Sequence, residues 1–403
     1  MKQVNMKKTT IAIACQGGGA QTAFTAGALQ ALFDAGIEKQ FDIVSIGGTS
    51  GGAVCGSLVW YALQAGEKPV CQRLLDYWSD NQPQLVPEAM FNNLVVAWSR
   101  LVGRGYIPTL EMSPYSPLAR YLIGTSTHGH RKTFADLRES LQTHMDFDQI
   151  RRWGPLNRKP ILVLGAANVL TGKMRKFVSR KEVIQVEHIM ASCAVPNIFP
   201  AVQIGEDAYW DGLFSDNPPI EALVRPLYVG PGNIPDELWL IKIDPTVRRT
   251  IPEAPDDILD RRKQMEGNIS LFQQLAFVEL LNDMILGGAF TRGFIKSFAI
   301  PKAIRIPKAF AEDPDKPYHI PLIEMSPELY SRLDWEAKLD RGNDNIGVLM
   351  DDGRRRAREF LKARQLVVEG PQHPPAPDGE RRRRARTLRT SRTAAATHLG
   401  LAP

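Results

Sequence analysis

The run Gly48-Thr49-Ser50-Gly51-Gly52 has the residue types and the spacing of a site for nucleophilic attack. It reads Gly-x-Ser-x-Gly, follows the apolar residues 41–46 and precedes a segment with a helical pattern. This context is typical of a nucleophile elbow, a sharp turn from strand to helix that presents a serine hydroxyl to a substrate carbonyl. Glycine at Gly48 and Gly52 lets the chain turn so tightly without clashes. We therefore predict Ser50 as the nucleophile.

A second glycine-rich run could stabilise the negative charge that forms when a serine attacks a carbonyl. Gly17, Gly18 and Gly19 follow the apolar residues 10–15 and precede a helical pattern. Backbone N–H groups at the beginning of a helix stabilise anions. Because this loop and the elbow end neighbouring predicted parallel strands, both should lie at one edge of the sheet. The three glycines are therefore predicted to form an oxyanion hole.

The same loop could instead bind a phosphate or be a purely structural turn. Thr22 stands where the Gly-x-Gly-x-x-Gly pattern has its third glycine, and the chain lacks the Gly-Lys-Ser/Thr sequence of a nucleotide-binding phosphate loop. A nucleotide-binding enzyme is the weakest of the readings, and no cofactor is predicted.

The serine also needs a base within hydrogen-bond reach. An ordinary hydrolase triad would place a histidine late in the chain, which makes His319 the natural candidate. However, Ser50 follows only the second predicted strand, and His319 lies in a strand-like run. We expect His319 to be a packed or surface residue.

Composition favours a folded, soluble protein of one large or two ordinary domains. The chain has 403 residues, 43% of them hydrophobic and 23% charged. Residues 371–403 contribute +5 of the net charge of +6, so the globular part is nearly neutral. The basic run at residues 381–386 could touch anionic lipid or nucleic acid, but such runs are common and unspecific, and we predict a solvated tail. No specific nucleic acid is predicted as a partner.

Cysteine usage and apolar runs indicate the compartment. Cys15, Cys55, Cys71 and Cys193 lack metal-ligand spacing and are predicted to be reduced thiols of a cytoplasmic protein, with no metal site. The first apolar run is too short for a secretory signal, and no uninterrupted apolar stretch approaches the roughly 20 residues needed to span a bilayer. Any membrane contact is expected to be peripheral.

The predicted elements alternate between strands and helices, which is typical of an α/β fold with a mainly parallel sheet. Strands are predicted at residues 10–15, 41–46, 160–169, 175–179, 208–210 and 237–243, with short strand candidates near Ile304 and at 319–323, and helices at 20–35, 50–64 and 185–193. The sheet-forming core should cover about residues 8–245, with a helical insertion at about 67–150 and a helical C-terminal region at about 254–368. Residues 369–403 are predicted to be a disordered basic tail, so the folded domain covers residues 1–368.

Two predicted helices have strongly apolar faces. In the first, the apolar residues are Met90, Phe91, Leu94, Val95, Trp98, Leu101 and Val102. Such a face could be a lid or a membrane-contacting surface, but amphipathic helices usually bury it. We therefore predict core packing here, and likewise for residues 271–286.

Taken together, these motifs resemble the patatin-like phospholipase family, in its bacterial branch. The glycine run resembles the family's oxyanion loop, and residues 48–52 resemble its nucleophile elbow. Residues 191–200 resemble its Ser-x-Ala-x-Pro block, and Asp211-Gly212 with Asn217-Pro218 resembles the block that carries its catalytic aspartate. The four blocks occur in the family's order between residues 10 and 220.

This resemblance implies a three-layer α/β/α fold and a serine acyl hydrolase without metal or cofactor. It implies that Ser50 and Asp211 form a catalytic dyad that cleaves carboxylic esters of phospholipids or other acyl lipids through an acyl-enzyme. Gln21 and Thr22 replace a basic residue and a glycine that are common in the family. This departure leaves a non-catalytic lipid-binding or regulatory protein as the alternative.

Overall fold

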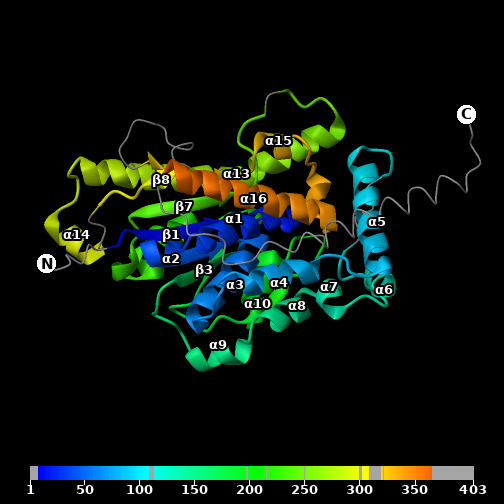
Figure 1. Cartoon of the computed structure of the whole chain (residues 1–403), viewed down its shortest axis with the longest axis horizontal. Helices are drawn as coiled ribbons and strands as arrows, with labels where there is room; N and C mark the ends of the chain where they lie inside the picture. Colours follow the sequence, from blue (N-terminus) through cyan, green and yellow to red (C-terminus); the bar gives the residue numbers. More distant parts are fainter. Residues whose placement is uncertain are drawn as a thin grey trace, which may run out of the picture. The chain divides into compact units, whose positions relative to one another are not determined.

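The computed structural model describes residues 8–108, 113–196, 198–214, 216–248, 250–298, 302–307, 319–320 and 322–364 (Figure 1). The chain divides into one unit of Met1–Val368 and a second of Glu369–Pro403. The second unit, which holds the predicted disordered tail, lies outside the described residues, as does Asn197 of the predicted Ser-x-Ala-x-Pro block.

The centre of the first unit is a sheet in the order β10-β7-β1-β2-β3-β6-β5, with β4 also paired to β3. Strands β10, β7, β1, β2 and β3 are parallel, whereas β4 and β6 run antiparallel to β3 and β5 runs antiparallel to β6. The strand bounds are β1 Thr10–Cys15, β2 Asp42–Gly48, β3 Ile161–Asn168, β4 Met174–Val178, β5 Val202–Ile204, β6 Asp207–Asp211, β7 Glu237–Lys242 and β10 Ile323–Glu324. The predicted α/β class with a mainly parallel sheet is confirmed.

Helices cover both faces of this sheet, and the inner strands β1 and β7 bury every side chain. In β1, Ile11 and Ile13 point into one apolar layer, whereas Ala12 and Ala14 point into the other. The first layer packs against α1 (Ala23–Asp34), α3 (Gly51–Ala65) and α16 (Asn343–Ala363), and α1 and α16 lie side by side in Figure 1. The second layer packs against α11 (Ile220–Val224) and α13 (Pro255–Leu286). The result is the expected three-layer arrangement.

The remaining helices and short strands connect and extend these layers. They are η1 Gly19–Thr22, α2 Ile37–Gln40, α4 Gln72–Asn81, α5 Val86–Gly103, α6 Pro117–Ser126, α7 Lys132–Ala135, α8 Leu137–His144, α9 Phe147–Trp153, α10 Val186–Cys193, η2 Gly212–Phe214, α12 Pro226–Val229, η3 Pro231–Asn233, α14 Arg292–Phe298, β8 Ile306–Pro307, β9 His319–Ile320, α15 Pro327–Tyr330 and η5 Trp335–Lys338. Helices α4 to α9 lie in the predicted insertion.

The prediction that the sheet is complete by residue 245 is wrong. Strand β10 comes some eighty residues later along the chain and pairs in parallel with β7, Ile323 opposite Ile241. A short strand candidate is predicted at residues 319–323, but two residues are too few for a periodicity that would show that the strand joins the central sheet. The helical C-terminal region therefore also completes one edge of the sheet.

The predicted core packing of the apolar face of residues 90–102 is also wrong. In α5 the side chains of Met90, Leu94 and Trp98 are exposed, whereas Glu88 and Asn92 are buried. Polar partners elsewhere in the chain decide this orientation, and a helical periodicity cannot reveal them.

The predicted core packing of residues 271–286 is confirmed for only part of helix α13. Leu271, Leu275 and Val278 pack against the sheet as predicted, but Phe277 and Leu280 are exposed. Within the described residues, α13 is the one helix that is long and apolar enough to cross a membrane. In its most apolar stretch of 18 residues, 33% of the residues are buried. By length and composition a core helix passes the same test, so this is weak evidence of a membrane span.

Candidate active site

Ser50 occupies the turn between β2 and α3 in a strained conformation. Its φ is 55° and its ψ is −132°, and it is the only non-glycine residue with a positive φ among those described. Such a conformation costs on the order of 1–3 kcal/mol and needs support from its surroundings. Ser192 gives that support: the Ser50 N–H donates to the carbonyl oxygen of Ser192 at 3.0 Å and to its Oγ at 3.1 Å. The Ser192 hydroxyl in turn donates to the Gly165 carbonyl at 2.7 Å.

The pairing of β3 brings the elbow and Asp211 to one place. Along one edge of β3, strand β4 pairs with residues 163–167. Strands β2 and β6 must therefore share the other edge, where Gly48 is opposite Leu164 and Asp211 is opposite Ala166. The end of β2 and the end of β6 consequently meet, and Asp211 lies directly beyond the strand that leads into the elbow.

Gly165, between these two positions on β3, leaves the room in which the two turns cross. A Cβ at this residue would lie 3.0 Å from Oγ1 of Thr49, the residue before Ser50. A Cβ on Gly212, the residue after Asp211, would lie 2.8 Å from the Gly165 carbonyl oxygen. The close approach of elbow and Asp-Gly turn therefore depends on these two glycines.

Asp211 is completely buried, and its carboxylate faces Ser50. Its Oδ1 accepts a hydrogen bond from the Leu213 N–H at 2.9 Å. Burial raises the pKa of Asp211 to about 7, and the hydrogen-bonding interactions with Ser50 and Leu213 oppose this shift. Within the described residues, the second carboxylate oxygen, Oδ2, makes no well-formed hydrogen bond. The interaction between Asp211 and Ser50 is therefore longer or less well aligned than an ordinary hydrogen bond. Catalytic hydrogen bonds are often loose before substrate binds.

A second buried carboxylate, Asp216, lies near the elbow but is engaged elsewhere. Its Oδ2 is 2.7 Å from Nζ of Lys176, and both side chains are largely buried. Its carbonyl oxygen accepts a hydrogen bond from the Thr49 hydroxyl. Burial raises the pKa of Asp216, and the nearby Lys176 ammonium opposes that shift. This pair positions the elbow, whereas Asp211 is the carboxylate that faces Ser50.

The glycine loop lies directly against the elbow. A Cβ on Gly17 would lie 2.7 Å from Cβ of Ser50. The Gly17 N–H, however, donates to Oδ1 of Asn217 at 2.6 Å, so this N–H is not available to an oxyanion. In the part of the chain that the structure describes, the N–H groups of Gly18 and Gly19 donate no hydrogen bond. The predicted donors are thereby reduced to these two.

A comparison with known proteins assigns the family. The family model described as Patatin-like phospholipase matches residues 13–224, just over half of the chain, and this range includes the elbow, Gly17 to Gly19 and Asp211. The chain belongs to the patatin-like phospholipase family. Membership supports lipid hydrolase activity. No curated protein sequence is significantly similar to the chain.

Two solved structures are similar to this patatin-like chain at low identity. VipD from Legionella pneumophila matches at 15% identity and a TM-score of 0.34, covering 85% of this chain and 67% of that one. The structure of full-length SpcU in complex with full-length ExoU from Pseudomonas aeruginosa matches at 17% identity and a TM-score of 0.22, covering 73% of this chain and 58% of that one. At these scores the superpositions add no argument, and the assignment depends on the family model.

The two residues that depart from the common patatin-like pattern are built into the protein. Gln21 is buried and donates to the Asp334 carbonyl at 3.4 Å, and the Thr22 hydroxyl donates to the Gly19 carbonyl at 2.6 Å. A basic side chain does lie close by, but it comes from η5. Lys338 has its Cε 3.8 Å from the position of a Cβ on Gly18, and its Nζ pairs with Asp244 at 2.6 Å.

Sequence reasoning had no signal for Lys338, because it lies more than three hundred residues beyond the loop that it contacts. It also assigned no individual role to Ser192 or Asn217, although both lie in the blocks that resemble the family. The only signal for Ser192 and Asn217 in the sequence is that each is a polar residue within one of these blocks.

Among the described residues, no histidine side chain forms a hydrogen bond with Ser50. His144 is buried beside Asp80, with 3.2 Å between Nε2 and the carboxylate, and His188 stacks on Phe177. His319 lies in β9, which pairs with β8 in a separate two-stranded sheet. Over the described ranges, no group of three or more His, Cys, Asp or Glu side chains is arranged to hold a metal ion.

A hollow beside η5 is a different place from this site. It has a volume of about 700 Å³ and is lined by residues that include Asp260, Arg332 and Trp335, but by neither Ser50 nor Asp211. The candidate active site is therefore located by its chemistry and not by the size of a cavity.

Proposed function

We propose that the protein is a serine acyl hydrolase that cleaves carboxylic ester bonds of phospholipids or other acyl lipids. Ser50 is the nucleophile and Asp211 is the base. The observation that supports this most is the shared edge of β3, which brings a buried carboxylate with a raised pKa to a strained serine. A base with a pKa near the working pH is well suited to accept and return a proton.

In the first half of the reaction, Ser50 Oγ bonds to the ester carbonyl carbon while Asp211 takes its proton. The carbonyl oxygen becomes an oxyanion, and the N–H groups of Gly18 and Gly19 stabilise it. The tetrahedral intermediate then collapses, the bond to the alcohol breaks, and Asp211 protonates the leaving oxygen. An acyl group remains on Ser50.

In the second half, water attacks the acyl-enzyme while Asp211 takes a proton from it. Collapse of the second intermediate releases the fatty acid, and the proton returns to Ser50 Oγ. One carboxylate thus acts alternately as base and acid, which requires that both of its protonation states are accessible near neutral pH.

The test combines covalent labelling with substrate profiling. A fluorophosphonate probe should label the protein, and a panel of phospholipids, acylglycerols, soluble esters and thioesters should show ester hydrolysis. Ser50→Ala should abolish both activities, and Asp211→Ala should lower them by at least about a thousandfold. Ser57→Ala, a buried serine in α3, and Asp207→Asn, an acid at the other end of β6, are the matched controls and should stay active.

Two results would contradict the proposal. Full activity of Asp211→Ala together with loss of activity in His319→Ala would replace the dyad with a triad. Absence of labelling at Ser50, with lipid binding retained in Ser50→Ala, would favour the non-catalytic lipid-binding protein instead.

A further inference from the structure

Helices α5 and α6 expose large apolar side chains of a kind that water-soluble proteins normally bury. On α5, Met90, Leu94 and Trp98 are 68%, 66% and 48% exposed. On α6, Leu118, Tyr121 and Ile123 are 57%, 68% and 54% exposed. We call these six residues the α5–α6 apolar surface. Large apolar side chains exposed on two successive helices are typical of a place where a protein meets another molecule.

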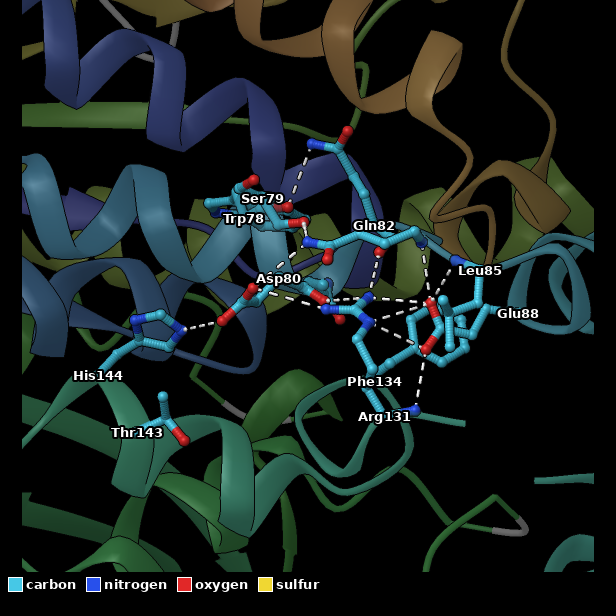
Figure 2. Close-up of polar contacts among 12 residues, drawn as sticks. Trp78, Ser79, Asp80, Gln82, Leu85, Glu88, Arg131, Phe134, Thr143 and His144 are labelled. Atoms are coloured by element: carbon cyan, nitrogen blue, oxygen red, sulfur yellow. Dashed lines mark hydrogen bonds and ion pairs between the residues drawn. The ribbon is translucent and has the colours of Figure 1, made fainter. Parts of the chain in front are cut away.

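The outward direction of the α5 face is specified by buried polar contacts. Glu88 is fully buried and accepts hydrogen bonds from the N–H groups of Gln84 at 2.8 Å and Leu85 at 3.2 Å. It also accepts from the Arg131 N–H at 2.9 Å and from its guanidinium at 3.0 Å, as Figure 2 shows. Burial alone would raise the pKa of Glu88, but these bonds lower it to about 2, so this carboxylate stays charged.

Two further polar residues of α5 extend this attachment along the helix. Asn92 donates to Asp340 at 2.8 Å and accepts from the Arg341 N–H at 2.8 Å. Near the other end of the helix, Arg100 pairs with Asp334 at 2.7 Å. Glu88, Asn92 and Arg100 therefore face the protein, and a helix held by its polar side must present its apolar side to the surroundings.

The charges around this surface suit an anionic occupant. Residues 86–132 carry five Lys or Arg but only two carboxylates. Glu88 is buried against Arg131, and Glu111 lies outside the described residues. Arg120 and Lys132 are exposed in the same range. Apolar and aromatic side chains combined with an excess of basic over acidic ones are the composition of surfaces that insert among anionic lipid headgroups. Residues 369–403 are an unsuitable cover, because they carry seven Arg and few large apolar side chains.

Both helices are connected to the candidate active site. The Tyr115 hydroxyl, just before α6, accepts from the Ala201 N–H at 2.8 Å. Two residues before Ala201, Phe199 is another exposed apolar residue. The same loop continues back to Ala194, whose carbonyl accepts a hydrogen bond from the Asp211 N–H at 2.9 Å. On the α5 side, Asp334 is the partner of Arg100. The carbonyl oxygen of Asp334 also accepts a hydrogen bond from the side-chain amide of Gln21, which lies beside the glycine loop.

We infer that the α5–α6 apolar surface docks on lipid bilayers that contain anionic phospholipid. Met90, Leu94, Trp98, Leu118, Tyr121 and Ile123 enter the headgroup region, and Arg120 and Lys132 contact the lipid phosphates. That docking delivers acyl esters to Ser50 rests on the proposed function, whereas the docking itself does not.

The experiment measures binding in the Ser50→Ala protein, so that it does not depend on hydrolysis. Full-length protein is sedimented with phosphatidylcholine vesicles, with and without about 30% phosphatidylglycerol. The triple variant Met90→Gln, Leu94→Gln, Trp98→Gln should weaken binding at least about tenfold, because these side chains lose the apolar transfer free energy. Arg120→Gln with Lys132→Gln should weaken only the binding to anionic vesicles. Val348→Gln, an equally exposed apolar residue on α16, is the matched control and should change binding less than about twofold.

A second measurement reports contact with lipid directly. An environment-sensitive dye on Leu94→Cys should shift its emission on addition of anionic vesicles, whereas the dye on Val348→Cys should not. Unchanged vesicle binding by the triple variant, or no dye shift at Leu94→Cys, would overturn the inference. So would a dimer in light scattering that the triple variant dissociates while vesicle binding is absent, because the surface would then be covered by a second copy. If the proteins bind lipid as expected but the active form hydrolyses no ester, the proposed function fails and the docking surface stands.

Discussion

The side-chain amide of Asn217 holds the backbone of Gly17 by two hydrogen bonds. The Gly17 N–H donates to Oδ1 at 2.6 Å, and Nδ2 donates to the Gly17 carbonyl at 3.3 Å. Asn217 is fully buried and two hundred residues away along the chain. Its amide thus fixes the first glycine of the loop against Ser50, and it occupies the donor that the sequence assigned to an oxyanion.

Asn217→Ala should therefore lower kcat on a soluble ester by about 10- to 100-fold, with little change in KM. It leaves both polar groups of Gly17 buried without a partner, at a cost of roughly 1–3 kcal/mol, and lets the loop move away from the transition state. Steady-state kinetics of the purified variant are the measurement. Asn233→Ala is the matched control, because Asn233 is a buried asparagine that bonds the Val229 carbonyl far along the chain from the elbow. A loss of activity as large in Asn233→Ala would show that the effect is one of stability.

The pH dependence of the reaction should report the titration of Asp211. Since the pKa of this carboxyl is raised to about 7 and the base must be ionised, kcat/KM should increase as the pH rises through about 7 and then level off. The profile is measured on a soluble ester between about pH 5.5 and 8.5, and the rate of fluorophosphonate labelling should follow the same curve. A flat profile over this range, or a midpoint near the ordinary pKa of an aspartate, would contradict the assignment of Asp211 as the base.

Asp211→Asn should stabilise the fold at alkaline pH while it removes activity. The folded protein binds the Asp211 proton more tightly than the unfolded chain does, so the free energy of unfolding falls as the pH rises from about 4 to about 7. Above that window the wild type pays for a buried charge, with an upper limit of roughly 4 kcal/mol, and the neutral amide does not. Calorimetry should show a Tm several degrees above the wild type near pH 8 and a smaller difference near pH 5. A Tm difference that is independent of pH would show that the charge of Asp211 is not the cause.

Ser192→Ala should destabilise the elbow more than an ordinary buried serine substitution. The hydroxyl of Ser192 accepts from the Ser50 N–H and donates to the Gly165 carbonyl, so its loss leaves that carbonyl without this donor, at roughly 1–3 kcal/mol. Urea unfolding is the measurement. Ser57→Ala offers the contrast, because the buried Ser57 hydroxyl has no hydrogen-bond partner within the described residues and its removal should be nearly neutral. Equal losses in both variants would leave Ser192 without a special role.

Local pattern predicted the parts of the site that depend on neighbouring residues. The strand at residues 10–15 has the predicted bounds, and the helix after the elbow ends at Gly66, whose φ of 72° suits a glycine cap. The elbow itself was readable because a strand, a tight turn and a helix follow each other along the chain. Periodicity and glycine spacing are local signals, and these elements obey them.

The misplaced features depend on partners far along the chain. The apolar face of α5 is turned outward by Arg131, Asp334 and Asp340, and the Gly17 N–H is occupied by Asn217. Hydrophobic periodicity shows that a helix has an apolar face but not which neighbour it meets. The assignment of Asp211 had a similar limit, because a lone Asp-Gly in a sequence is usually only a turn.

By itself, then, the sequence determined that this chain carries a serine elbow, a glycine loop and an α/β sheet, since each follows from the chemistry of adjacent residues. Only the tertiary structure decided which groups surround the serine. Strand β3 places β2 and β6 on one edge, and this pairing brings Asp211 to Ser50 across 160 residues of chain. Burial at that point raises the pKa of the carboxyl, and burial is a property of the packed fold.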